Sequence, residues 1–290
     1  MNQDILVSVI APVYNEEECI KKYVSETLQV LKDNYLNYEL ILVDDGSTDN
    51  SRKYIKEIQN NTENIRLLSL SRNYGREVAI TAGLESSIGD YVVLMDSDLQ
   101  DPSDLIPKLV DKAVSGFDVV YAARDSRSGE SYFKKISSKY FYRIAAKMTG
   151  LNIQDDAGDF RVFSRRVVNS INQLKEQNRY MKMLYAYVGF SSTGIPFERK
   201  KRYAGKTKYS YSKMINASLD AIISFSNKPL RIVSIFCVSL SLVLLISIVF
   251  VTIYKLDYSN NIVQGWASTV ILILILFSIL FIFLAVISEY

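Results

Sequence analysis

Residues 90–102, DYVVLMDSDLQDP, join a short apolar run to a cluster of carboxylates. The run at 91–95 carries no charge and is rich in β-branched and aromatic residues, which predicts a buried strand. Asp96, Asp98 and Asp101 follow it directly. Ligands of open α/β sheets bind beyond the carboxyl ends of the strands. The segment therefore predicts a strand of a sheet and, beyond the carboxyl end of that strand, a binding site.

Around this segment, short apolar runs alternate with stretches of helical length and periodicity. Residues 16–32 and 104–115 are helix candidates. The strand candidates are residues 5–11, 38–43, 65–70, 91–95 and 119–122. Such alternation predicts an α/β fold, Rossmann-like, with a mostly parallel sheet covered by helices.

Two further strand ends carry polar clusters. The first candidate strand ends in Pro12, Tyr14 and Glu16, and the second in Asp44 and Asp45. Helix capping explains any single cluster, since Asp and Ser often precede a helix. Carboxylates at adjacent strand ends repel one another unless a cation or donor groups meet them, so a shared ligand explains the set better.

Two sequence motifs that bind nucleotide ligands are missing, which reduces the number of possible ligands. No G-x-G-x-x-G follows the first strand, and G-x-x-x-x-G-K-[ST] is absent from the chain. A dinucleotide oxidoreductase and a P-loop NTPase thereby lose their main support. Aspartate oxygens suit Mg²⁺ or Mn²⁺ bound together with a diphosphate.

The composition excludes other classes of protein. A net charge of +3 over 290 residues is too small to favour nucleic acid. Cys19 and Cys237 lie far apart, which indicates neither a disulfide framework nor a metal site. The chain contains no histidine, so acid–base or metal chemistry must rest on carboxylates. Its first residues lack a basic stretch before an apolar core, and we expect no cleaved signal peptide.

The C-terminal part has the composition of a membrane anchor. Residues 232–254 and 267–288 are charge-free, and each run is long enough as a helix to cross a hydrocarbon core of about 30 Å. We therefore expect a domain of residues 1–228 followed by a two-span hairpin of residues 229–290. Lysines and arginines crowd before the first span, whereas the turn between the spans has only Lys255. The positive-inside rule then places the large domain in the cytoplasm. We expect a multi-pass protein of the inner (cytoplasmic) membrane.

Three segments before the spans are candidates for contact with membrane lipid. In residues 132–149, apolar side chains recur at helical spacing among lysines and arginines, which predicts an interfacial helix on anionic lipid. A surface helix packed on the core is the alternative. Residues 211–228 form a weaker, juxtamembrane candidate. The basic run 199–208 could be a solvated loop, but its place before the membrane favours contact with lipid phosphate.

Six motifs follow one another along the chain: VIAPVYNEE, LILVDDGSTDNS, RNYGREVAITAGL, DYVVLMDSDLQDP, AGDFRVFSRR and RKKRYAGKTKYS. With the two spans, this ordered set resembles the polyprenyl-phosphate branch of the family 2 glycosyltransferases. That branch has the GT-A fold and includes dolichol-phosphate mannose synthase and bacterial undecaprenyl-phosphate glucosyltransferases. The resemblance covers essentially the whole chain.

The resemblance implies an inverting, metal-dependent transfer of a sugar from a nucleotide diphosphate donor to polyprenyl phosphate. UDP-glucose is the expected donor, and UDP-N-acetylglucosamine, UDP-galactose and GDP-mannose are the alternatives. A homotetramer is implied as well, and a separate flippase could move the product across the membrane.

The resemblance also implies roles for individual residues. Asp96, Asp98 and Asp159 would be the catalytic carboxylates, and Asp98 with Gln100 would bind Mg²⁺ or Mn²⁺. Dolichol-phosphate mannose synthases tend to have serine at the position of Asp159, which argues against an obligatory base. The nucleotide sugar would contact Pro12, Tyr14, Glu16, Asp44, Asp45, Asp96, Ser97 and Arg124. Phosphates of the donor or the lipid would face Arg124, Arg202 and Lys208.

Two other functions are alternatives to this one. A processive polysaccharide synthase would have more spans and a Q-x-x-R-W motif, to which residues 177–180 correspond poorly. A catalytically inactive membrane scaffold that still binds a nucleotide sugar is the alternative from another class. Intact Asp96, Asp98 and Gln100 argue against it.

Overall fold

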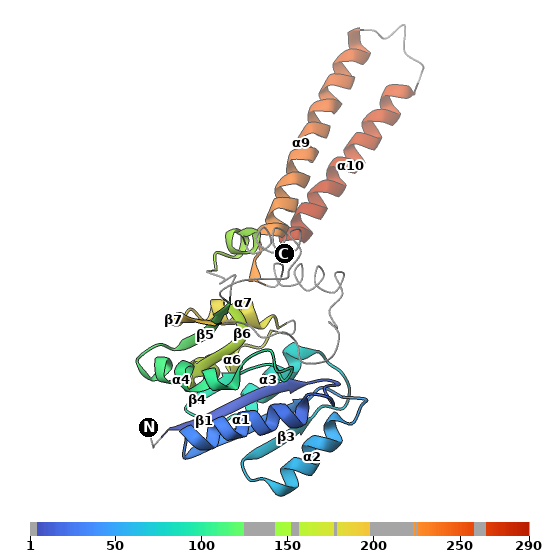
Figure 1. Cartoon of the computed structure of the whole chain (residues 1–290). Coiled ribbons are helices and arrows are strands. Elements are labelled where there is room, and N and C mark those ends of the chain that lie inside the picture. Colours follow the sequence, from blue (N-terminus) through green and yellow to red (C-terminus); the bar gives the residue numbers. More distant parts are fainter. Residues whose placement is uncertain are drawn as a thin grey trace. The chain divides into compact units, whose positions relative to one another are not determined.

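The computed structural model describes residues 5–124, 143–151, 157–176, 179–197, 223, 225–257 and 265–289. The chain divides into two compact units, Met1–Ala221 and Ile222–Tyr290 (Figure 1).

The first unit is built on a seven-stranded sheet in the order β3-β2-β1-β4-β6-β5-β7. β6 runs antiparallel to β4 and β5, and the other neighbouring strands are parallel. The predicted mostly parallel α/β sheet is thus confirmed. The strands are β1 (Leu6–Val13), β2 (Asn37–Asp44), β3 (Ile65–Ser69), β4 (Tyr91–Leu94), β5 (Val119–Arg124), β6 (Ala157–Ser164) and β7 (Ser192–Phe197).

Helices cover both faces of this sheet. The helices are α1 (Ile20–Asn34), α2 (Ser51–Asn61), α3 (Arg76–Ser86), the 3-10 turn η1 (Ser103–Leu105), α4 (Ile106–Val114), α6 (Arg165–Gln173) and α7 (Met181–Tyr187). Alternate residues of a strand point to opposite faces. Val9 of β1 accordingly packs in the cluster beneath α1, whereas Ile10 lies under α3, where a Cβ on Gly83 would be 2.3 Å from its Cγ2.

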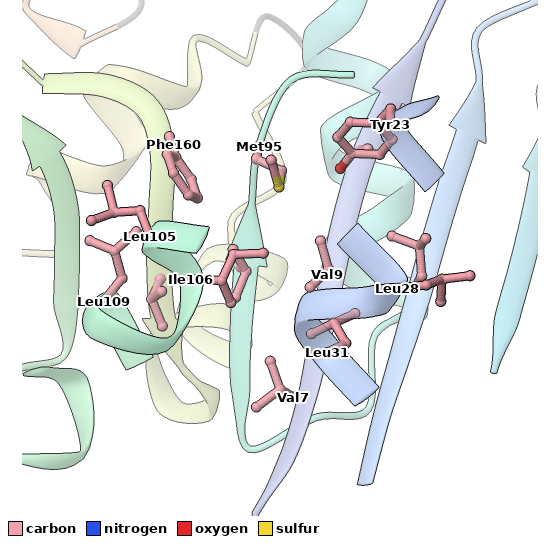
Figure 2. Close-up of a cluster of buried hydrophobic side chains, with 14 of the residues drawn as sticks. Val7, Val9, Tyr23, Leu28, Leu31, Met95, Leu105, Ile106, Leu109 and Phe160 are labelled. Carbon is pink, nitrogen blue, oxygen red and sulfur yellow. The ribbon is translucent and has the colours of Figure 1, made fainter. Parts of the chain in front are cut away.

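The cluster beneath α1 and α4 is the main hydrophobic core (Figure 2). Val7 and Val9 contribute from β1, Leu31 from α1, Leu109 from α4 and Phe160 from β6, and all are essentially inaccessible to water. Burial of strands on both faces is characteristic of parallel sheets. The core therefore fixes β1, β4 and β6 side by side, and these strands carry the candidate site.

The helix candidate at residues 132–149 is described only in its last part. Residues 143–149 are helical, with Ala145 buried and Ile144 half exposed. Most of the two remaining membrane-contact candidates, residues 199–208 and 211–228, lies outside the described residues, and so do Arg202 and Lys208. Their contact with lipid stays a prediction.

The second unit contains α9 (Lys228–Asp257) and α10 (Trp266–Glu289), which pack side by side as a hairpin (Figure 1). Their apolar parts have mean hydropathies of 2.9 and 3.5, and both helices are long enough to cross a membrane. They contain the two predicted spans. Small side chains lie between them: the Ser241 and Ser278 hydroxyl oxygens are 2.8 Å apart and buried.

Candidate active site

The sheet topology brings the described candidate residues to one edge. β1, β2 and β4 are parallel, so the segments that follow them emerge together. β6 runs the opposite way beside β4, which places Asp159, near its beginning, at that edge. Arg124 ends β5, which is antiparallel to β6, and so reaches the same edge. Residues from five separate segments are thereby gathered, although their roles stay predictions.

The loops after β1 and β2 are joined by hydrogen bonds through Asn15. Its amide N–H donates to Ser47 Oγ (3.0 Å), and its side-chain oxygen accepts from the Thr48 amide (2.8 Å). Asn15 has a φ of 54°, a left-handed conformation that asparagine tolerates better than most residues. Asn15 is absent from the predicted site, but it fixes the backbone between Tyr14 and Glu16.

Glu16 also begins the first helix. Its carbonyl accepts hydrogen bonds from the Cys19 and Ile20 amides, and its own amide donates to Ser51 Oγ at 2.8 Å. The segment carrying Tyr14 and Glu16 is therefore held by its backbone on both sides.

Asp44 and Asp45 both engage backbone amides of the protein. Asp44 Oδ1 accepts from the Ser47 amide (3.1 Å). Asp45 accepts from Tyr74 through one oxygen (2.7 Å) and from Gly75 through the other (2.9 Å). Burial raises the pKa of Asp45, and the two amide donors offset part of that rise. Asp45 thus anchors the loop before α3.

The carboxylates of Asp96 and Asp159 share one cation, Arg76. Its Nη2 and Nε lie 2.6 and 3.1 Å from Asp96 Oδ1, and its Nη1 lies 2.9 Å from Asp159 Oδ2. The negative charge at the strand ends is therefore balanced in part by an arginine of the protein itself. The sequence alone predicts that a bound ligand balances it. Arg76 is missing from the predicted site. The sequence feature that could have revealed Arg76 is its place in the first turn of a helix, where the helix dipole disfavours a cation.

Glu77, the next residue of α3, is a second titratable group missing from the prediction. Its Oε2 accepts a hydrogen bond from the Met181 amide at 3.1 Å. The pKa of Glu77 is raised to about 7, mainly by burial and also by the charge of Asp159, against the lowering effects of Arg76, Lys182 and the Met181 amide. The site thus contains one carboxyl group poised to titrate near neutral pH.

The segment after β4 carries the expected metal ligands. Ser97 Oγ donates to the Pro12 carbonyl at 3.0 Å, which ties this segment to β1. Asp98 Oδ1 accepts from the Gln100 amide at 3.1 Å, across Leu99 with a φ of 61°. In the described part of the chain, no three Asp, Glu, Cys or His side chains gather as a metal cage. Mg²⁺ commonly uses one or two carboxylates, with substrate phosphates and water completing its shell. Asp98 and the Gln100 side chain fit that pattern.

A mostly parallel sheet, with helices on both faces and polar clusters beyond its carboxyl ends, is the arrangement of the doubly wound α/β folds, which bind ligands such as nucleotides at that place. The family model "Glycosyl transferase family 2" matches residues 8–171. The chain belongs to this family, and it is a glycosyltransferase.

Full-length relatives agree with this assignment. An uncharacterized glycosyltransferase of Synechocystis is 40% identical over 286 residues, covering 99% of this chain and 90% of its own length. A bactoprenol glucosyl transferase of Shigella phage SfX is 33% identical over 287 residues, which is 98% of this chain and 93% of the relative.

A solved structure supports the fold. The chain is similar to glucosyl-3-phosphoglycerate synthase of Mycobacterium tuberculosis, crystallised with Mn²⁺, UDP and phosphoglyceric acid. The TM-score is 0.53 and the identity 19%, over 76% of this chain and 77% of that one.

Proposed function

We propose that this glycosyltransferase transfers glucose from UDP-glucose to undecaprenyl phosphate at the cytoplasmic face of the inner membrane. The observation that carries the proposal is the combination, in one chain, of the carboxylate-lined sheet edge with two helices of membrane-spanning length. The similarity to the phage protein, named for transfer of glucose and for bactoprenol, supports the acceptor and the sugar.

The reaction forms one bond and breaks one. A phosphate oxygen of the lipid attacks the anomeric carbon, the bond from that carbon to the donor phosphate breaks, and its electron pair leaves on UDP. Attack from the opposite side inverts an α-linked donor into a β-linked lipid phosphate sugar.

The acceptor requires little general base catalysis. The second pKa of a phosphate monoester is about 6, so the acceptor is mostly dianionic at neutral pH. Positioning then matters more than deprotonation. Asp159 is proposed to orient the acceptor or to stabilise positive charge growing on the sugar, which agrees with a chain that has no histidine.

Departure of UDP requires positive charge at the diphosphate. Asp98 and Gln100 would hold Mg²⁺ or Mn²⁺, which offsets negative charge on the leaving group when bound. Arg124, at the end of β5, is proposed to face the same phosphates. Arg202 and Lys208 are proposed to contact donor or lipid phosphate. The base and ribose are proposed to be lined by Pro12, Tyr14, Glu16 and Asp45, with Asp44 close by.

The decisive experiment incubates membranes containing the full-length protein with undecaprenyl phosphate and radiolabelled nucleotide sugars. Label from UDP-glucose should enter the lipid fraction, depend on a divalent cation, and disappear in Asp98→Ala. Preferential label from UDP-N-acetylglucosamine, UDP-galactose or GDP-mannose would change the sugar but not the reaction. Calorimetric binding of UDP with Mn²⁺ but no transfer from any donor would instead identify an inactive scaffold. Homotetramer assembly and cooperation with a flippase stay predictions.

A further inference from the structure

The pairing of β4 with β6 places Asp96 and Asp159 at the same end of two neighbouring strands. β4 and β6 are antiparallel, with Tyr91 opposite Ser164 and Leu94 opposite Arg161. Asp96 lies two residues after Leu94 and Asp159 two residues before Arg161, so both carboxylates lie at this same end of the strand pair. Like charges held close together on neighbouring strands are destabilising. The sheet therefore creates an electrostatic conflict at the edge where an anionic donor and an anionic acceptor would both have to bind.

Arg76 resolves this conflict from outside the strand pair. Its guanidinium reaches both carboxylates at 2.6 and 2.9 Å, and its side chain is only 26% exposed. Burial opposes the charge on Arg76, but Asp159 and Asp96 outweigh that effect and raise its pKa well above the usual value. Arg76 is thus a cation throughout the physiological pH range, set against two carboxylates.

The backbone before Arg76 is held on two sides. Asp45 accepts hydrogen bonds from the Tyr74 and Gly75 amides. Gly46, with a φ of 70°, packs so closely that a Cβ there would lie 2.4 Å from the Arg72 carbonyl carbon. The loop that delivers Arg76 is therefore fixed by the two residues that follow β2.

We propose that Arg76 is a positioning residue for sugar transfer, bridging Asp96 on the donor side and Asp159 on the acceptor side. This inference rests on the proposed function. The bridge fixes the relative placement of the two carboxylates and removes one of their two negative charges before anionic substrates bind. A guanidinium can serve two carboxylates at once through its planar set of N–H donors, whereas an ammonium acts as a point charge.

The test compares Arg76→Met and Arg76→Lys with Arg66→Met in the full-length protein in detergent micelles. Arg66 is a matched control, because it also pairs with a carboxylate, Glu39 at 2.9 Å, but near the opposite end of the strands. For Arg76→Met we expect kcat to fall about 100-fold, as for other lost preorganised charges, and the Kd of UDP with Mn²⁺ to rise severalfold. Arg76→Lys should lose about tenfold in kcat at an unchanged melting temperature. Arg66→Met should lower the melting temperature and leave kcat intact.

Wild-type kcat and Kd in a folded Arg76→Met overturn the inference. If Arg76→Met does not fold, the kcat of Arg76→Lys is the test instead. A wild-type kcat in Arg76→Lys then overturns the inference. Equal kcat losses in Arg66→Met and Arg76→Met also overturn it, because they indicate a general structural effect. If the wild type does not use undecaprenyl phosphate, the proposed function fails. The Kd of UDP with Mn²⁺ then decides alone, supporting a role for Arg76 if weakened and refuting it if unchanged.

Discussion

Glu77 on α3 accepts a hydrogen bond at 3.1 Å from the backbone amide of Met181, the first residue of α7. The contact joins two residues that are 104 positions apart in sequence. Burial is the main reason why the pKa of Glu77 rises from 4.5 in the unfolded chain to about 7 in the folded protein. Between these two pH values, Glu77 is therefore protonated in the folded protein but ionised in the unfolded chain.

This difference predicts a stability that falls as pH rises. A raised carboxyl pKa stabilises the fold fully below about pH 4.5, and that stabilisation is lost between about pH 4.5 and pH 7. The loss is on the order of 3 kcal/mol, at about 1.4 kcal/mol per pKa unit. Glu77→Gln keeps a hydrogen-bond acceptor without the ionisation, so its stability should change less between pH 5 and pH 8. Thermal unfolding followed by circular dichroism at both pH values measures this.

Glu85→Gln provides the control, because Glu85 lies on the same helix but is exposed. Its pH dependence should match that of the wild type. A Glu77→Gln variant that loses as much stability as the wild type between pH 5 and pH 8 contradicts this account of Glu77.

A second prediction concerns the glycine behind the Arg76 loop. Gly46→Ala places a Cβ 2.4 Å from the Arg72 carbonyl carbon, at a φ of 70° that side chains rarely adopt. Gly116→Ala imposes a similar backbone penalty, with a φ of 117°, but meets nothing within 4 Å. Both variants should lose stability, by about 1–3 kcal/mol from the backbone alone. Only Gly46→Ala should also lose transfer activity, since only there must the loop before Arg76 shift. Comparing melting temperature with kcat for the two variants measures this, and equal activity losses would refute it.

The strands that could be predicted from the sequence are those with unbroken apolar runs. The candidates at residues 5–11, 38–43, 65–70, 91–95 and 119–122 correspond to β1–β5, and every end agrees within two residues. β6 is not predicted because Asp159 and Arg161 break up its apolar run at the candidate site, a place where local rules commonly fail. β7 is not predicted from the sequence because it contains Gly194 and Pro196, residue types that are unusual in strands. Proline is tolerated there because β7 lies at the edge of the sheet.

The site was predictable only where its residues adjoin strand ends. Asp45, Asp96 and Asp98 follow strands directly, so position in sequence reveals them. Arg76 and Glu77 sit in a helical segment, and their importance comes from contacts with Asp159 and Met181, distant in sequence. Such contacts depend on strand order, including the antiparallel insertion of β6, which no local pattern contains.

A third prediction separates chemistry from structure at Asp159. Asp159→Asn keeps the shape of the side chain and leaves Arg76 paired with Asp96. We expect kcat to fall at least tenfold, because the negative charge proposed to act on the acceptor or sugar is gone, while UDP with Mn²⁺ still binds. Asp118→Asn is the matched control: Asp118 also pairs with an arginine, Arg166, but lies before β5, away from the site. It should reduce stability and spare turnover. Near-wild-type turnover in Asp159→Asn would remove Asp159 from the mechanism.

The fourth prediction tests the packing of α9 against α10. The Ser241 and Ser278 hydroxyl oxygens are 2.8 Å apart, and both side chains are almost fully buried. Hydrogen bonds between membrane helices contribute only about 0.6 kcal/mol on average, so a loss of stability in Ser241→Ala is too small to be decisive. Proximity is better tested by a disulfide, whose Cβ atoms must approach to about 4 Å. In a background without Cys19 and Cys237, the pair Ser241→Cys and Ser278→Cys should oxidise within one chain.

Gel mobility with and without reductant detects this disulfide in membranes containing the full-length protein. Ser239 lies on the same helix but is exposed, so Ser239→Cys with Ser278→Cys is the matched control and should remain reduced. A cross-link that joins two chains, or one that forms equally in both pairs, would be incompatible with this hairpin. An intrachain cross-link confined to the first pair would establish that α9 and α10 meet at Ser241 and Ser278 in the membrane. Their large apolar side chains, more than two fifths exposed at Phe250, Leu256, Phe283 and Ile287, would then be free to contact lipid.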